Sequence, residues 1–80
     1  MTNLEKYKNA FLETFEINEQ LLREKNLEYN TIEEWDSVGH MNLMAALEEE
    51  FDIMLETEDI IEFSSFEKGK EILRKYDIEI

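Results

Sequence analysis

The residues most able to do chemistry lie around residue 37, where the chain reads WDSVGHMNL from residue 35 to residue 43. Asp36 has the character of a helix cap, so Ser37 would be the first helical residue and would lie on the surface. The first backbone amides of a helix have no acceptor within it, and the helix dipole favours an anion at that end. A phosphate ester on the Ser37 hydroxyl would therefore lie in a favourable field, within easy reach of a modifying enzyme.

Ser37 has no neighbour that would make it a nucleophile of its own. No residue is evidently placed as its base, and the sequence does not indicate an oxyanion hole. His40 is three residues further along the helix and hence near Ser37. We expect it to be a surface or partner-contact residue, with contact to a phosphate as the alternative. We interpret Ser37 as a residue on which another enzyme acts, and the chain as not an enzyme, although an Asp-Ser pair alone is also ordinary helix capping.

The helix that carries Ser37 is expected to run from the Asp36 cap to about Phe51. Apolar residues occupy a wide arc of it, which predicts burial on one side and a partner surface on the other. The side expected to be buried carries Leu43, Met44, Leu47 and Phe51. The other side carries Val38, Met41 and Ala45. Methionines at helical spacing are more often core residues, so a core position is the alternative for Met41.

A first helix is predicted over about Leu4–Phe15, because Thr2 and Glu5 have the spacing of a capping box. Its apolar residues recur at helical spacing on one face. They are Leu4, Tyr7, Phe11, Leu12 and Phe15. This face should contribute to the core.

About 20 residues connect this helix to the one that carries Ser37. Residues Glu19–Glu24 would form at most a short helical turn, and loop character is expected at Asn26, Asn30 and Thr31. A free connection of this length is unusual in a small domain, so its apolar residues are expected to hold it against the core. Trp35 should anchor it by packing against the second long helix.

After residue 51 the sequence predicts a short helix at about Glu58–Glu62. The side chains expected to face inward from it are Ile60 and Ile61. The carboxylates of this region raise the alternative of an EF-hand calcium loop, which needs oxygen ligands at alternating positions and a central glycine. A loop counted from Asp52 would place Met54 on a ligand position and Thr57 on the glycine position, so we reject it.

The last helix is expected to start after Ser64 or Ser65 and to end near Tyr76. Ser64 and Glu67 have capping-box spacing. The inner face should consist of Phe66, Ile72, Leu73 and Tyr76. The elements together predict an all-α fold for residues 1–80: a single domain, built as a small four-helix bundle with three longer helices, one short helix and a long loop between helices 1 and 2.

Composition narrows the function classes. The formal net charge of -13 would repel nucleic acid and anionic membrane surfaces, would favour basic partners, and favours a monomer through self-repulsion. A hydrophobic fraction of 42% excludes a disordered chain. With no cysteine and one histidine, neither a disulfide framework nor a zinc site is expected, so no metal ligands are assigned. No signal peptide or membrane span is recognised, and a cytoplasmic location is expected.

The stretch Asp36-Ser37-Val38, followed by Leu43 and then ALEEEF over residues 46–51, resembles the signature of the acyl carrier protein family. The resemblance covers the whole chain. It includes the apolar first helix, the long loop, the short helix before Ser64 and the closing helix.

The resemblance implies a modification and a function. A phosphopantetheinyl transferase, with coenzyme A and magnesium, would attach 4'-phosphopantetheine to Ser37. The thiol of that arm would carry an acyl or aminoacyl group as a thioester and present it to loading and transfer enzymes. In many members the bundle also shelters an acyl chain. Asp36 would cap the helix and be recognised by the transferase. The residues that would meet basic patches and apolar contacts of partner enzymes are Val38, Met41, Glu48 and Glu49.

Two positions depart from the fatty-acid-synthesis pattern of the family. Gly39 stands where those carriers usually have an acidic residue, and Asn42 where they usually have glutamate. The departure favours a specialised biosynthetic pathway over general fatty acid synthesis. The alternative is an unmodified acidic helical protein-interaction module, in which Glu48–Glu50 form a solvated face and a Ser37→Ala change is silent.

Overall fold

The computed structural model describes residues 2–24 and 27–80 of the chain. This part contains five α-helices. They are α1 (Asn3–Phe15), α2 (Glu19–Glu24), α3 (Ser37–Phe51), α4 (Thr57–Glu62) and α5 (Phe66–Arg74). Helices α1, α3 and α5 have more than seven residues each, and no strand occurs in these ranges. The prediction of an all-α fold is confirmed. The predicted count of four helices omits α2, which is a short helix within the expected loop, and the loop position Asn26 lies outside the described residues.

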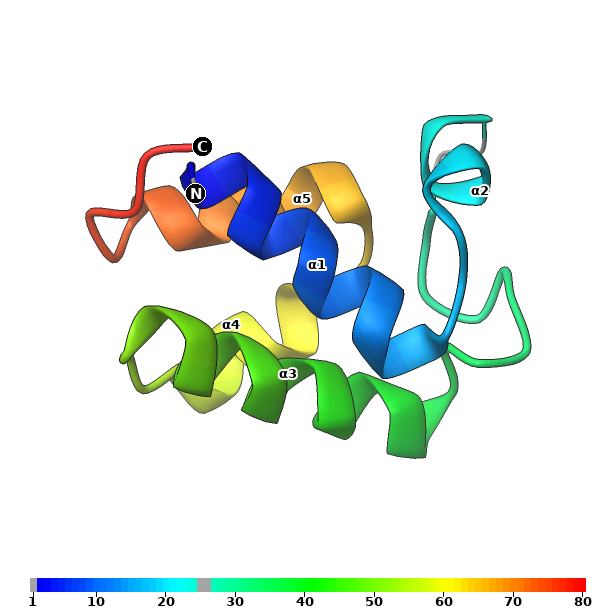
Figure 1. The fold of residues 1–80 in the computed structure, drawn as a ribbon. Helices are drawn as coiled ribbons and strands as arrows, with labels where there is room; N and C mark the ends of the chain where they lie inside the picture. Colours follow the sequence, from blue (N-terminus) through cyan, green and yellow to red (C-terminus); the bar gives the residue numbers. More distant parts are fainter. Residues whose placement is uncertain (1, 25–26) are drawn as a thin grey trace.

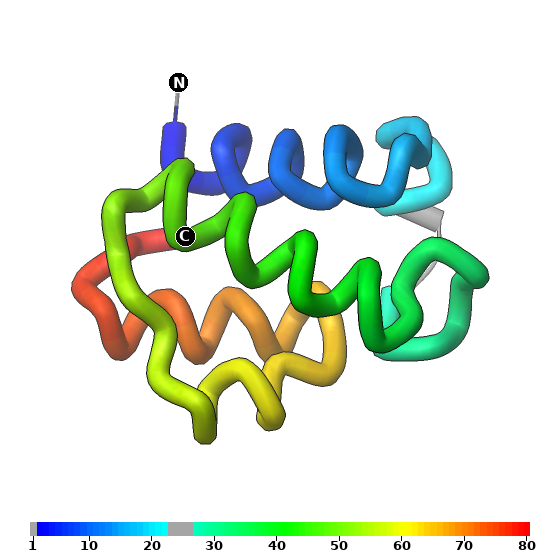
Figure 2. Tube along the Cα trace, turned by 90° about the horizontal axis from the view of Figure 1, so that it is seen from below, coloured from blue at the N-terminus to red at the C-terminus, as the bar shows by residue number. Residues whose placement is uncertain are grey.

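The helices are arranged in two layers. In Figure 1, α1 and α5 lie above α3 and α4, and the two ends of the chain lie side by side. Asn3 Nδ2 donates a hydrogen bond of 3.1 Å to the Glu79 carbonyl and so ties these ends together. Figure 2 shows α3 between α1 on one side and α4 and α5 on the other. Over the described ranges, no helix has both the length and the apolar character needed to cross a membrane.

Helix α1 begins as its capping residues predict. The Thr2 hydroxyl accepts a hydrogen bond from the Glu5 amide at 3.1 Å, and the Glu5 carboxylate accepts one from the Thr2 amide at 3.4 Å. These contacts satisfy amides that the helix itself leaves free. The inward face carries the buried side chains Tyr7, Ala10, Phe11 and Phe15.

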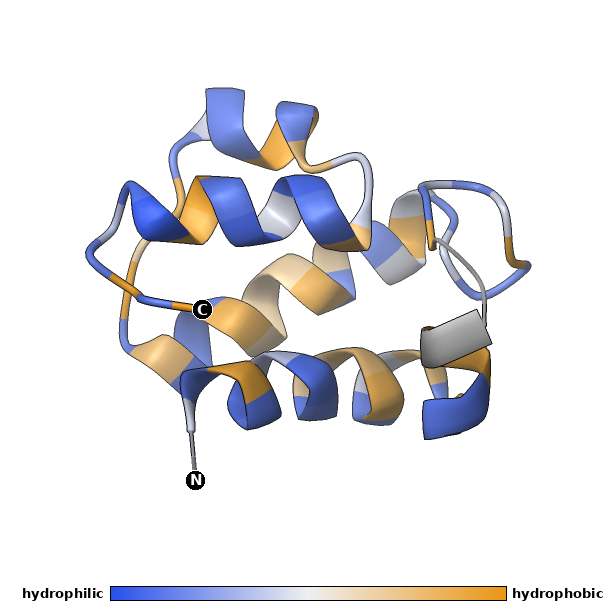
Figure 3. Cartoon of the chain, turned by 90° about the horizontal axis from the view of Figure 1, so that it is seen from above, coloured by the Kyte–Doolittle hydropathy of each residue, from blue (hydrophilic) through white to orange (hydrophobic). Residues whose placement is uncertain are grey.

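An aromatic cluster fills the space between the layers. Phe11 packs edge-on against Tyr7 and Trp35, with ring centroids 5.0 and 5.5 Å away. Helix α3 supplies the aliphatic side of the core through the buried side chains Leu43, Met44 and Leu47. Figure 3 shows apolar residues along α3 and on the side of α1 that faces it. This packing fixes the position of α3.

The connection between α1 and α3 is held to the rest of the molecule. Leu27 and Trp35 are buried in the core. The Phe66 amide donates to the Leu27 carbonyl at 2.9 Å, and the Tyr29 amide donates to the Ser64 carbonyl at 2.8 Å. The expectation that apolar residues hold this segment against the core is confirmed. The backbone of the segment is hydrogen-bonded to residues at the start of α5.

Helix α4 differs from the prediction in which side chains face inward. Ile60 is partly buried, but Ile61 is 75% exposed, so its predicted inward position is wrong. Asp59 is buried instead, since its carboxylate accepts a hydrogen bond from Lys75 Nζ at 2.6 Å and another from the Tyr76 hydroxyl. A helix of six residues can turn only a few side chains toward the core. The ion pair between Asp59 and Lys75 selects the side of α4 that faces inward.

Helix α5 is capped one residue later than the Ser64–Glu67 spacing predicts. The Ser65 hydroxyl accepts the Lys68 amide at 2.9 Å, whereas Ser64 is exposed. The backbone bonds to Leu27 and Tyr29 set this register, because they hold Ser64 and Phe66 in place before the helix starts.

Candidate functional site

The first turn of α3 places Ser37 on the surface. Asp36 is the N-cap, as predicted, and its Oδ1 accepts a hydrogen bond from the Gly39 amide at 2.8 Å. The His40 amide donates to the Asp36 carbonyl at 2.7 Å. Ser37 is the first helical residue and is exposed. The amides of Ser37 and Val38 have no acceptor within the helix and provide the positive end of its dipole.

Gly39 is required by the close approach of the preceding loop. A Cβ atom at this position would lie 1.9 Å from the Glu34 carbonyl oxygen. No side chain fits without a shift of that backbone. The absence of an acidic residue here therefore has a structural reason, because the loop before Asp36 packs directly on the helix.

His40 is a structural bridge, and it is half-buried where a surface or partner-contact residue was expected. Its Nδ1 accepts a hydrogen bond from Trp35 Nε1 at 3.0 Å, so the proton of the neutral ring is on Nε2. His40 Nε2 then donates to the Ile60 carbonyl at 2.7 Å. The imidazole is half-buried and lies parallel to the Trp35 ring, with centroids 6.2 Å apart. Because both ring nitrogens are engaged, His40 joins α3 to the buried tryptophan and to α4.

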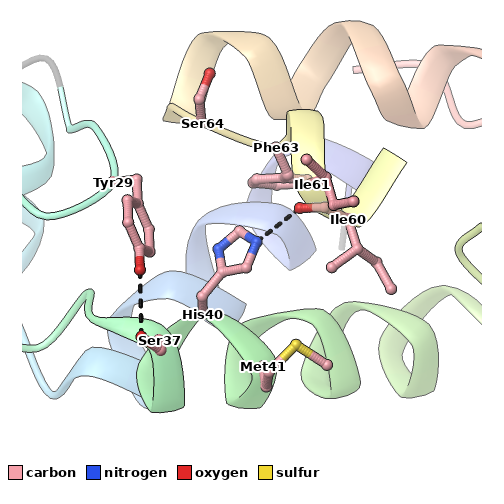
Figure 4. Close-up of a pocket in the computed structure, with 8 residues that line it drawn as sticks. All are labelled: Tyr29, Ser37, His40, Met41, Ile60, Ile61, Phe63 and Ser64. Atoms are coloured by element: carbon pink, nitrogen blue, oxygen red, sulfur yellow. Dashed lines mark hydrogen bonds between the residues drawn. The ribbon is translucent and has the colours of Figure 1, made fainter. Parts of the chain in front are cut away.

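A cleft of about 340 Å³ opens beside Ser37, between α3 and α4. Most of its lining is apolar, and Ser37 lies at one end (Figure 4). The lining residues are Tyr29, Ser37, His40, Met41, Ile60, Ile61, Phe63 and Ser64. The Tyr29 hydroxyl lies 3.4 Å from Ser37 Oγ. No local sequence pattern predicts this cleft, because its walls come from three segments that only the fold brings together.

Exposed apolar side chains lie on the outer side of α3, next to Ser37. Val38 is 70% exposed and Met41 is 55% exposed, while Met44 is buried. The predicted division of the helix into a core side and an outer side is thus confirmed, and the core alternative for Met41 is wrong. Ile61 joins this outer surface from α4.

Glu48 and Glu49, which were predicted together as partner-binding residues, differ in their surroundings. The Glu48 carboxylate is half-buried and accepts a hydrogen bond from the Leu55 amide at 2.9 Å, so it holds the α3–α4 connection. Glu49 is exposed. Both lie about 17 Å from Ser37 along the helix, at about 1.5 Å per residue. The structure therefore gathers Asp36, Val38 and Met41 around Ser37 but leaves the two glutamates at the far end of α3.

The negative charge is concentrated on the elements that form the site. Residues 26–67 contain 13 of the 21 acidic residues and none of the eight basic ones. The remaining residues contain eight acidic and eight basic residues. The whole formal charge of -13 therefore arises from the segment that includes α3 and α4, so a basic surface would be attracted to this part of the molecule.

Comparison with protein-family models, with curated proteins and with solved structures gave no match.

Proposed function

We propose that the protein is an acyl carrier protein, which carries an acyl or aminoacyl group as a thioester on 4'-phosphopantetheine attached to Ser37. The observation that carries this proposal is the position of the Ser37 hydroxyl. It is exposed at the start of a long helix and lies at the rim of an apolar cleft. The arrangement of the helices also supports a bundle of the acyl carrier type. It consists of the three longer helices α1, α3 and α5 and the short helix α4.

The residues at the start of α3 fit a phosphate-linked group. Ser37 offers an accessible oxygen, and the free amides of the first turn favour an anion beside it. Asp36 is engaged with the Gly39 amide, so it keeps the helix start in place and presents its outer face to a phosphopantetheinyl transferase. When bound, the arm supplies a thiol that holds the cargo as a thioester.

The cleft supports a sheltering role toward apolar cargo. Met41, Ile60 and Phe63 provide its walls. An acyl chain that enters it would lose contact with water, which favours burial by about 0.8 kcal/mol per methylene group. His40 is held by Trp35 and by the Ile60 carbonyl, so it joins α4 to α3 at the side of the cleft.

The charged and apolar surface around Ser37 supports weak, rapid docking to partner enzymes. Val38, Met41 and Ile61 provide apolar contact next to the serine, and the acidic segment attracts basic patches on loading and transfer enzymes. Such binding is fast and sensitive to salt, as suits a carrier that must leave each enzyme. Gly39 and Asn42 favour a specialised biosynthetic pathway, and a cytoplasmic monomer remains our expectation.

The same surface also suits the alternative, an unmodified interaction module. Incubation with coenzyme A, magnesium and a broad-specificity phosphopantetheinyl transferase separates the two. The parent and a Ser64→Ala variant should gain the mass of one phosphopantetheine, and a Ser37→Ala variant should gain none. Ser64 is the matched control, because it is a second exposed serine and lines the same cleft. No gain in any variant, with a known carrier modified in parallel, would favour the interaction module.

A further inference from the structure

Tyr29 links the two sides of the cleft. Its amide donates to the Ser64 carbonyl at 2.8 Å, beside an antiparallel bridge between Glu28 and Ser65. The backbone of Tyr29 is thus held at the junction of α4 and α5. Its side chain extends from there toward the first turn of α3 (Figure 4).

The ring of Tyr29 is supported by the ring of His40. It packs edge-on against His40, with centroids 5.4 Å apart and an angle of 83° between the planes. His40 is itself held by Trp35 and by the Ile60 carbonyl. Tyr29 is nevertheless 42% exposed, so its burial does not explain why the phenol lies 3.4 Å from Ser37 Oγ. The phenol is therefore close enough to form a hydrogen bond to a group attached to Ser37 Oγ.

A phosphodiester on Ser37 would bring a negative charge next to Asp36. Residues 26–67 contain no lysine or arginine to balance it. The first-turn amides of α3 and the phenol of Tyr29 are donors next to Ser37. A hydrogen bond to an ionised acceptor is shorter and stronger than one between neutral groups. The long contact between Tyr29 and Ser37 would therefore be replaced by a stronger one.

We propose that the Tyr29 phenol donates a hydrogen bond to the phosphodiester carried by Ser37 and so holds the base of the arm at the mouth of the cleft. This inference rests on the proposed function. Tyr29 is a positioning residue, since it touches no reacting atom of the thioester. With this hydrogen bond, the arm lies in the cleft when no partner enzyme is bound.

The test is ³¹P NMR of the modified protein. The parent, Tyr29→Phe and Ser64→Ala are each loaded with phosphopantetheine, and each ³¹P resonance is compared with that of the same protein unfolded in urea. The phenylalanine variant keeps the ring that packs on His40, so its melting temperature should equal that of the parent. Loss of one hydrogen bond should lower the equilibrium constant for docking of the arm about tenfold. The ³¹P resonance of Tyr29→Phe should therefore move toward the unfolded reference, while that of Ser64→Ala stays with the parent.

The other results would overturn the inference. A parent-like resonance in Tyr29→Phe would mean that the phenol does not bind the phosphate, although the carrier function would stand. An equal shift in Ser64→Ala would mean that any change in the cleft loosens the arm, which contradicts a specific role for Tyr29. Failure of the parent to gain the phosphopantetheine mass would remove the proposed function and this inference together.

Discussion

His40 and Trp35 share a hydrogen bond of 3.0 Å from the indole Nε1 to the imidazole Nδ1. Trp35 is fully buried, so its N–H has no access to solvent and depends on this acceptor. The other imidazole nitrogen donates to the Ile60 carbonyl of α4. One side chain thus satisfies the buried indole and sets the distance between the two helices that form the cleft.

Replacement of His40 by alanine should therefore destabilise the fold. It leaves the indole N–H without its partner, at a cost of about 1–3 kcal/mol in the free energy of unfolding. Urea denaturation measures this loss, and native-state hydrogen exchange should show faster opening of α4. Asn42→Ala, an exposed change on the same helix, is the control and should stay within about 0.5 kcal/mol of the parent. Equal stability of the two variants would contradict the bridging role.

Gly39→Ala should also destabilise the protein, which is the reverse of the usual effect in a helix. A Gly→Ala change that fits its site stabilises a protein by about 0.4–1 kcal/mol. Here the new Cβ atom would lie 1.9 Å from the Glu34 carbonyl oxygen, so the loop or the helix start must move. Overpacking of this kind costs about 1–3 kcal/mol. A higher urea midpoint for Gly39→Ala would show that the loop does not pack on α3 as described.

Replacement of Glu48 and of Glu49, the two glutamates predicted to bind partners, should have different effects on the free energy of unfolding. Glu48→Ala removes the acceptor of the buried Leu55 amide and should lower the free energy of unfolding by about 0.5–1.5 kcal/mol. Glu49→Ala changes an exposed residue and should have an effect below about 0.5 kcal/mol. Paired urea titrations of the two variants test this difference. Similar losses in both would mean that the hydrogen bond to Leu55 does not stabilise the fold.

The ion pair of Asp59 predicts a dependence of stability on pH. Hydrogen bonds from Lys75 and then from Tyr76 lower the pKa of the Asp59 carboxyl below its ordinary value of 3.8, although burial opposes them. A lowered pKa in the folded state adds stability above the unfolded value, and this stability is lost as the pH falls through the folded one. Asp59→Asn should therefore be less stable than the parent at neutral pH, and the difference should shrink below about pH 4. A difference in urea midpoint that stays constant between pH 7 and pH 3 would contradict this assignment.

Local sequence signals predicted the features that depend on neighbours along the chain. The Thr2–Glu5 capping box, the Asp36 cap and the outer positions of Val38 and Met41 are all confirmed. Each follows from helix geometry, in which three or four residues determine the contacts.

The features that the sequence did not predict depend on residues far apart in the chain. Ser65 caps α5 because Leu27 and Tyr29 bind the backbone on either side of it. Asp59 faces inward because Lys75, 16 residues later, meets it. The cleft likewise needs Tyr29, α3 and α4 together, so no local pattern reveals it.

Attachment of the arm to Ser37 is tested by peptide fragmentation mass spectrometry of the parent protein after incubation with coenzyme A, magnesium and the transferase. We predict one phosphopantetheine per chain, located on Ser37. Modification at another serine or threonine, or an unmodified chain beside a fully modified reference carrier, would contradict the account.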